Sequence, residues 1–90
     1  MQEFQFSCVR GDNTEFYANI AYIGNETDLV KAIHEFKIFL LDKSLGTRED
    51  ELNNLSTLKQ ILESYDVIPV SMIITGVGCW DDYEQLKEKL

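Results

Sequence analysis

The residues best suited to covalent chemistry in this sequence are Cys79 and His34. Cys79 precedes a predicted helix, whose N-terminal dipole lowers the pKa of a thiol, and it follows the loop Gly76-Val77-Gly78. His34 is the single histidine and lies beside an apolar helical stripe. A histidine in that position is more often solvated or hydrogen-bonded than catalytic. A thiol enzyme is therefore the weaker hypothesis, and we predict that the chain is not an enzyme.

The same region offers weak signals for phosphate or cation binding. Gly76-Val77-Gly78 lacks the third glycine of a dinucleotide fingerprint, and Asp81 and Asp82 follow where an anion would approach. Together with Glu84 and Glu88, these aspartates do not have the spacing of a calcium-binding loop. Two cysteines and one histidine are too few and too scattered for a zinc site. We expect no cofactor and no metal.

The net charge limits what the chain can bind. Sixteen acidic residues against eight basic ones give a formal charge of −8 over 90 residues. Among the basic residues, only Lys87 and Lys89 lie within two positions of each other. Phosphate backbones are bound by clusters of lysine and arginine, so we expect no direct binding to nucleic acid. A basic protein surface is the favoured partner.

Two groups of carboxylates fall where helix N-termini are predicted, and each holds more charge than capping requires. Trp80 adds an aromatic side chain of the kind that anchors protein interfaces, although it could equally pack back onto the core. The candidate partner-binding residues are Glu49, Asp50, Glu51, Trp80, Asp81, Asp82, Tyr83 and Glu84. The alternative site is the outer face of the predicted hairpin around Tyr17, Asn19 and Ile23.

A small acidic chain without a catalytic cluster is typical of proteins that occupy a basic surface on another protein. We therefore predict an inhibitor that masks a basic, nucleic-acid-binding surface of a partner enzyme such as a nuclease. Phage anti-defence proteins, anti-CRISPR proteins among them, and toxin-immunity proteins share this profile of size and charge. The alternative function is a structural or assembly module that homodimerises through the second strand or through the edge beside Pro69.

Length and composition favour a single α+β domain over residues 1–90. The first residues have neither the basic nor the apolar region of a signal peptide, and no apolar run approaches the length of a membrane span. Cys8 and Cys79 are too few for a disulfide framework and indicate reduced thiols. These features predict a cytoplasmic protein that does not enter membranes.

Alternating apolar residues predict two strands, over residues 3–9 and 15–23, joined as an antiparallel hairpin. Gly11-Asp12-Asn13 supplies residues that tolerate a reversal of the chain, so the tripeptide Arg10-Gly11-Asp12 indicates a turn and not an adhesion motif. The outer face of the second strand is partly apolar, so that strand is expected to be covered on both sides or to lie in a contact surface.

Leu29, Ile33, Phe36 and Leu40 form a helical stripe, although residues 36–41 are also compatible with a strand. Gly46 is a plausible stop for this helix. A second helix is expected to begin at a capping box of Thr47 and Asp50, or later because of Asn53 and Asn54. A third strand over residues 66–75, with Pro69 near its start, and a last helix from Asp81 complete the order β-β-α-α-β-α. This order predicts a three-stranded antiparallel or mixed sheet backed by helices.

Overall fold

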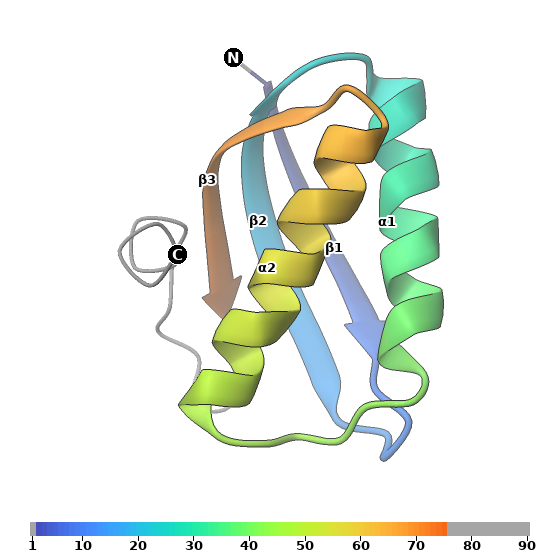
Figure 1. The fold of residues 1–90 in the computed structure, drawn as a ribbon, viewed down its shortest axis with the longest axis vertical. Helices are drawn as coiled ribbons and strands as arrows, with labels where there is room; N and C mark the ends of the chain where they lie inside the picture. Colours follow the sequence, from blue (N-terminus) through green and yellow to red (C-terminus); the bar gives the residue numbers. More distant parts are fainter. Residues whose placement is uncertain (1, 76–90) are drawn as a thin grey trace.

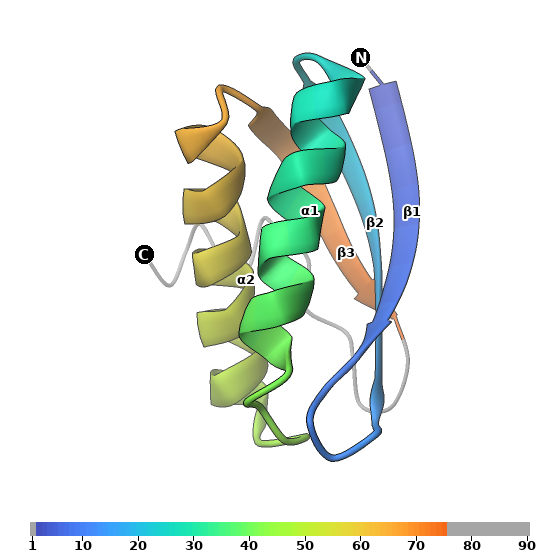
Figure 2. The same ribbon diagram turned by 90° about the vertical axis from the view of Figure 1, so that its right-hand side faces the viewer.

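The computed structural model describes residues 2–75. Two antiparallel strands, β1 (Gln2–Val9) and β2 (Glu15–Ile23), are followed by two helices and a last strand. The helices are α1 (Glu26–Leu40) and α2 (Arg48–Ser64), and the strand is β3 (Ile68–Thr75). The three strands form one antiparallel sheet, and both helices pack on the same face of it (Figures 1 and 2). The predicted α+β class is confirmed, and the predicted helix from Asp81 lies outside the described residues.

The predicted hairpin is present, and its register determines which side chains enter the core. β1 pairs with β2 without interruption from Gln2 opposite Tyr22 to Val9 opposite Glu15. Because opposite residues point to the same side of an antiparallel sheet, Phe6 and Cys8 lie on the same face as the buried residues of β2. That face is covered by the helices.

The third strand pairs with β2, so β2 is the central strand. The sequence left this pairing undecided. Pro69 lies on the outer strand, as predicted, where a missing N–H donor is tolerated. The register shifts between Ala21 and Tyr22, which marks a bulge in the pairing of β2 with β3.

Helix α1 begins where the sequence predicts. The side chain of Asn25 accepts hydrogen bonds from the backbone N–H groups of Thr27 and Asp28. The apolar stripe is buried as far as Leu40, which excludes a strand over residues 36–41. The prediction that Gly46 stops this helix is wrong, because the helix ends at Leu40. Beyond this point, the carbonyls of Leu40 and Lys43 accept hydrogen bonds from the backbone amide of Gly11 in the hairpin loop.

Helix α2 begins at the predicted capping box. The Thr47 side chain accepts from the amide of Asp50, and the Asp50 carboxylate accepts from the amide of Thr47. The helix begins at Arg48, before Asn53 and Asn54, so the asparagines do not delay its start. Asn54 is buried among the leucine side chains of the helix. Leu55, Leu58 and Leu62 are fully buried against the sheet.

Three phenylalanines from three elements form the centre of the core. The rings of Phe16 and Phe36 lie 5.3 Å apart between centroids, and Phe6 meets Phe36 edge to face at 6.4 Å. Such aromatic contacts favour tilted or perpendicular rings. Burial of each phenylalanine side chain contributes about 1.5–3 kcal/mol. The cluster therefore fixes α1 against the hairpin.

The opposite face of the sheet is not covered by any element among residues 2–75 (Figure 2). Five described apolar side chains on this face are at least 40% exposed: Val9, Tyr17, Ile23, Ile68 and Ile73. The hydroxyl of Tyr17 donates to the carboxylate of Glu15, and this hydrogen bond raises the pKa of Tyr17. Within residues 2–75 no element covers this face of the second strand, and the expectation that the face lies in a contact surface stays a prediction.

Candidate functional site

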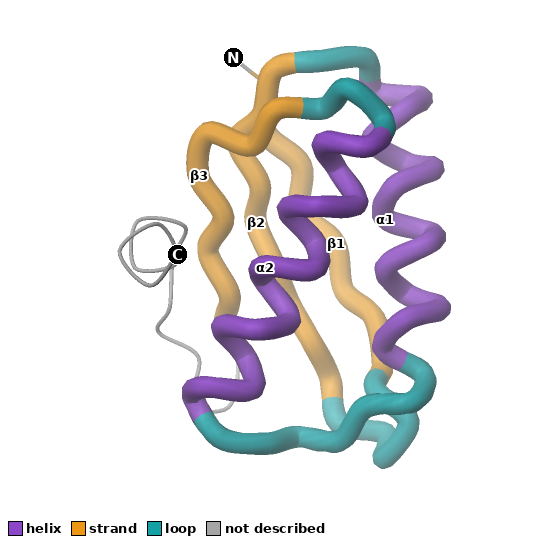
Figure 3. The backbone as a smooth tube through the Cα atoms, viewed as in Figure 1, coloured by secondary structure: helices purple, strands orange, loops and turns teal. Residues whose placement is uncertain are grey.

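Three segments that are distant in sequence meet at one end of the domain. They are the hairpin loop of residues 10–14, the connection of residues 41–47 between the helices, and the first turn of α2, residues 48–51 (Figures 1 and 3). We call this region the loop end. It contains one of the two carboxylate groups that the sequence analysis singled out.

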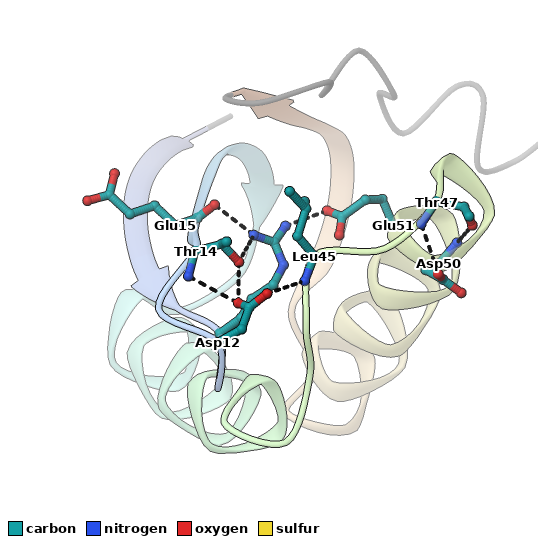
Figure 4. Close-up of polar contacts among 8 residues, drawn as sticks. Asp12, Thr14, Glu15, Leu45, Thr47, Asp50 and Glu51 are labelled. Carbon is teal, nitrogen blue, oxygen red and sulfur yellow. Dashed lines mark hydrogen bonds and ion pairs between the residues drawn. The ribbon is translucent and has the colours of Figure 1, made fainter.

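A buried ion pair lies at the centre of the loop end. Nη2 of Arg10 donates to Oε2 of Glu51 at 2.8 Å, and both side chains are at least 95% buried. Nη1 of Arg10 donates to the carbonyl of Glu15 at 2.8 Å and to the hydroxyl of Thr14 at 3.2 Å. The guanidinium also lies 5.4 Å from the centre of the Phe16 ring. The pair therefore joins the hairpin to the first turn of α2 (Figure 4).

This geometry corrects the role expected for Glu51. The sequence places Glu51 among exposed acidic residues at a helix N-terminus, yet its carboxylate is inside the molecule. The reason is that Arg10 enters the same space from the hairpin loop, and a buried guanidinium requires a negative partner. The Glu51 carboxylate is therefore the buried partner of Arg10 and is not exposed on the surface.

Asp12 connects the two loops. Its carboxylate accepts from the hydroxyl of Thr14 at 2.5 Å and from the amide of Thr14 at 3.1 Å. It also accepts from the amide of Leu45 at 2.9 Å, across 33 positions in the sequence. Hydrogen bonds from the Thr14 hydroxyl, from Leu45 and from the Thr14 amide lower the pKa of Asp12 to about 2. The carboxylate therefore stays charged at neutral pH while it holds the loops together.

Gly11 allows the two loops to approach each other. Its amide donates to the carbonyls of Leu40 at 3.1 Å and Lys43 at 2.8 Å. A Cβ atom at Gly11 would lie 2.2 Å from the carbonyl oxygen of Leu41, so the backbone could not stay in place. Residues 11–13 form a turn, as the sequence predicts for Arg10-Gly11-Asp12.

The predicted site residues of the first carboxylate group thus divide into different roles. Asp50 is exposed but belongs to the capping box, Glu49 is exposed beside it, and Glu51 is buried. The predicted residues of the second group, Trp80, Asp81, Asp82, Tyr83 and Glu84, lie outside the described residues. The last described strand, β3, ends at the same end of the domain at which α2 begins (Figure 1).

The fold adds exposed carboxylates that the sequence analysis did not include in the site. Asp12 and Asp42 are exposed in the two loops, at the end of the domain at which α2 begins. By sequence, these segments contain five carboxylates and three basic residues, Arg10, Lys43 and Arg48, and Arg10 is paired with the buried Glu51. The loop end is consequently acidic. The turn signal at Gly11-Asp12 could have located one of these carboxylates, but its contact with Leu45 depends on tertiary structure.

The described residues give no support to a thiol or metal site. His34 is exposed on α1, and Cys8 is half-buried on the core side of β1, where burial raises the pKa of its thiol. Cys79 lies outside the described residues. Within residues 2–75, no group of three or more histidine, cysteine, aspartate or glutamate side chains is arranged to hold a metal ion.

No protein-family model, curated protein or solved structure matches this chain. Neither of the two described helices has the length and hydropathy needed to span a bilayer.

Proposed function

We propose that this protein is a stoichiometric inhibitor that occupies a basic surface on another protein and uses the loop end as its contact. One observation carries the proposal: exposed carboxylates of two loops and a helix N-terminus lie at one end of the domain, while Arg10, one of the basic residues of that end, is buried against Glu51. Negative charge held on a fixed frame accelerates encounter with a positive surface. A nucleic-acid enzyme, such as a nuclease, is the class of partner that this charge fits.

The polar network favours binding because it orders the loop end before any partner arrives. Asp12 and Asp50 accept backbone hydrogen bonds, so their positions are fixed by the fold. Ordering of side chains and loops on association lowers affinity, and an ordered surface avoids that cost. An anti-defence or toxin-immunity protein of the cytoplasm would have this form, and the half-buried, reduced Cys8 is compatible with that compartment.

A homodimeric structural module is the second candidate function. It is favoured by the open face of the sheet, where Tyr17, Ile23, Ile68 and Ile73 are exposed. A hollow of about 410 Å³ on this face is lined by side chains that include Gln5, Ser7, Tyr17, Asn19 and Ile73. Exposed apolar groups of this kind can mark a protein interface.

Charge reversal at the two ends of the domain tests the first proposal. The double variant Asp42→Lys/Glu49→Lys changes the loop end, and Glu3→Lys/Glu26→Lys makes the same change in net charge at the opposite end. Each pair includes one glutamate from the first turn of a helix, which matches the effect on helix stability. Both variants are compared with the native chain in binding the protein that the chain captures from its native host.

We expect the loop-end variant to associate about tenfold more slowly at low ionic strength, and the opposite-end variant to change by about twofold at most. The difference should vanish at high salt, where charges are screened. Equal rates for the two variants would reject the loop end as the contact. Sedimentation of the isolated chain tests the second candidate, because an apolar dimer should persist at high salt.

A further inference from the structure

The two outer strands of the sheet differ in how they are protected against pairing with another strand. β3 contains Pro69, and its pairing with β2 is interrupted by a register shift. β1 is eight residues long, contains no proline, has an uninterrupted register with β2 and carries one charged residue, Glu3. Proline, bulges and charges are the usual means of preventing edge-to-edge association. Within residues 2–75, β1 therefore leaves alternate backbone N–H and C=O groups available along its free side.

A groove runs along the free side of β1. In Figure 1 α1 lies beyond β1 on the side away from β2, so that α1 lies over the free side of β1. The groove has a volume of about 400 Å³. Its lining includes Phe4, Phe6, Val30 and Ile33, together with His34 and Lys37. Phe4 is half-buried and Val30 is 50% exposed, so apolar surface is accessible in the groove.

The charge of this groove is opposite to that of the molecule as a whole. Its lining residues include Lys37 and His34 and no aspartate or glutamate. A segment that enters the groove as a strand would place every second side chain toward α1. Apolar side chains would meet Phe4 and Val30, and a carboxylate would be attracted to Lys37.

We propose that the free side of β1 binds an extended, mainly apolar segment of another protein as a fourth strand, with a carboxylate of that segment beside Lys37. The main chain of the segment would satisfy the unpaired groups of β1, and the groove would select alternate side chains. This site is on a different part of the surface from the loop end and does not depend on the function proposed above.

A second copy of this chain fits the groove less well than an extended segment. If β1 paired with β1 of a second copy, the α1 helix of each copy would lie over the β1 strand of the other. Packed helices require axes about 8–10 Å apart, so two copies of α1 would compete for the same position. An isolated strand brings no helix with it.

Selection from a phage-displayed library of 12-residue peptides against the full chain tests this proposal. The selected peptides should alternate apolar residues and contain Asp or Glu. A synthetic copy of one of them should shift the NMR amide signals of β1 and of α1 near Lys37. Lys37→Glu should weaken binding of that peptide about tenfold, whereas Lys31→Glu, a matched change on the same helix, should alter it by about twofold at most.

Several results would overturn the proposal. The proposal would fail if the selected peptides lacked an alternating apolar pattern, or if the selection yielded no binding peptide. Signal changes on β3 or on the open face of the sheet would place binding elsewhere. Equal binding by the Lys37→Glu and Lys31→Glu variants, with both shown to be folded by circular dichroism, would remove the role of the groove charge. Concentration-dependent pairing of β1 with itself would identify the second copy as the occupant.

Discussion

The loop end and the free side of β1 use their polar groups in opposite ways. At the loop end, the amides of Gly11, Leu45 and Thr47 all have acceptors within the protein, and Arg10 is neutralised by Glu51. Along β1, the backbone N–H and C=O groups of every second residue point away from β2, and no strand among residues 2–75 pairs with them. The loop end pairs these backbone amides within the protein and presents charge, whereas the free side of β1 presents unpaired backbone and apolar surface.

This difference indicates two kinds of contact with other proteins. A satisfied, charged surface attracts a partner over a distance but gains little from displacing water. An unpaired strand beside an apolar groove acts at short range, through backbone hydrogen bonds and buried area. Changes at the loop end should therefore affect folding stability and association rate, while changes around β1 should affect affinity for extended segments.

The largest effect is expected from breaking the ion pair at the loop end. Glu51→Ala leaves the Arg10 guanidinium buried without its negative partner, and should lower the free energy of unfolding by about 3–5 kcal/mol. The measurement is chemical denaturation of the native chain and the variant. The double variant Arg10→Met/Glu51→Leu removes both charges and should lose much less, because Nε of Arg10 and Oε1 of Glu51 have no hydrogen-bond partner among the described residues. A Glu51→Ala variant as stable as the native chain would show that the loop end does not depend on this pair.

A smaller loss is expected from closing the space at Gly11. A methyl group there meets the Leu41 carbonyl, so Gly11→Ala should force the loops apart and cost about 1–3 kcal/mol. Ser44→Ala, in the exposed part of the same connection, is the control and should leave the melting temperature unchanged. Equal melting temperatures for the two variants would mean that the loops do not approach as closely as described.

Cys8 extends the comparison to the core side of β1. Its side chain is half-buried beside the aromatic cluster, so Cys8→Ser should cost about 1 kcal/mol by partly burying a hydroxyl. Cys8→Ala, which buries no polar group, is the control. Binding of the selected peptide should be the same in both variants. Cys8 does not line the groove, so a loss of peptide binding in a folded Cys8→Ser variant would contradict the placement of the binding site at Phe4, Val30 and Lys37.

The smallest effect is a dependence on pH that arises from Asp12. Its pKa is about 2 in the folded protein, below its ordinary value near 4, so the folded state favours the ionised form. The resulting stabilisation is fully present above about pH 4 and is lost as pH falls through about 2. Asp12→Asn should therefore be less stable than the native chain at pH 7, and the difference should narrow below pH 4. A urea midpoint difference that is constant from pH 7 to pH 2 would contradict this assignment.

Local patterns were sufficient to predict the hairpin, both described helices and the edge position of Pro69. They were informative because each depends on residues close in sequence, such as the alternation in β1 or the capping of α2 by Thr47 and Asp50. The pairing of β3 with β2 could not be predicted, since it depends on how the helices cross the sheet. The predicted stop at Gly46 was wrong for a similar reason, because the end of α1 is set by contacts with Gly11.

The candidate site was predictable only in part. An acidic run at a helix start indicates where carboxylates cluster, but it does not reveal which of them is buried. Glu51 is buried because Arg10 reaches it from 41 positions away in the sequence. The hydrogen bond from the Leu45 amide to Asp12 joins residues 33 positions apart, so no local pattern predicts it either. Long-range ion pairs and loop contacts were therefore the information that the sequence patterns lacked.

Amide hydrogen exchange measured residue by residue tests the central comparison most directly. We predict slow exchange at Gly11 and Leu45, whose amides donate within the loop end, and alternating slow and fast exchange along β1. Exchange at Gly11 and Leu45 as fast as in an unstructured peptide, or uniformly slow exchange along β1 in the isolated chain, would contradict this account.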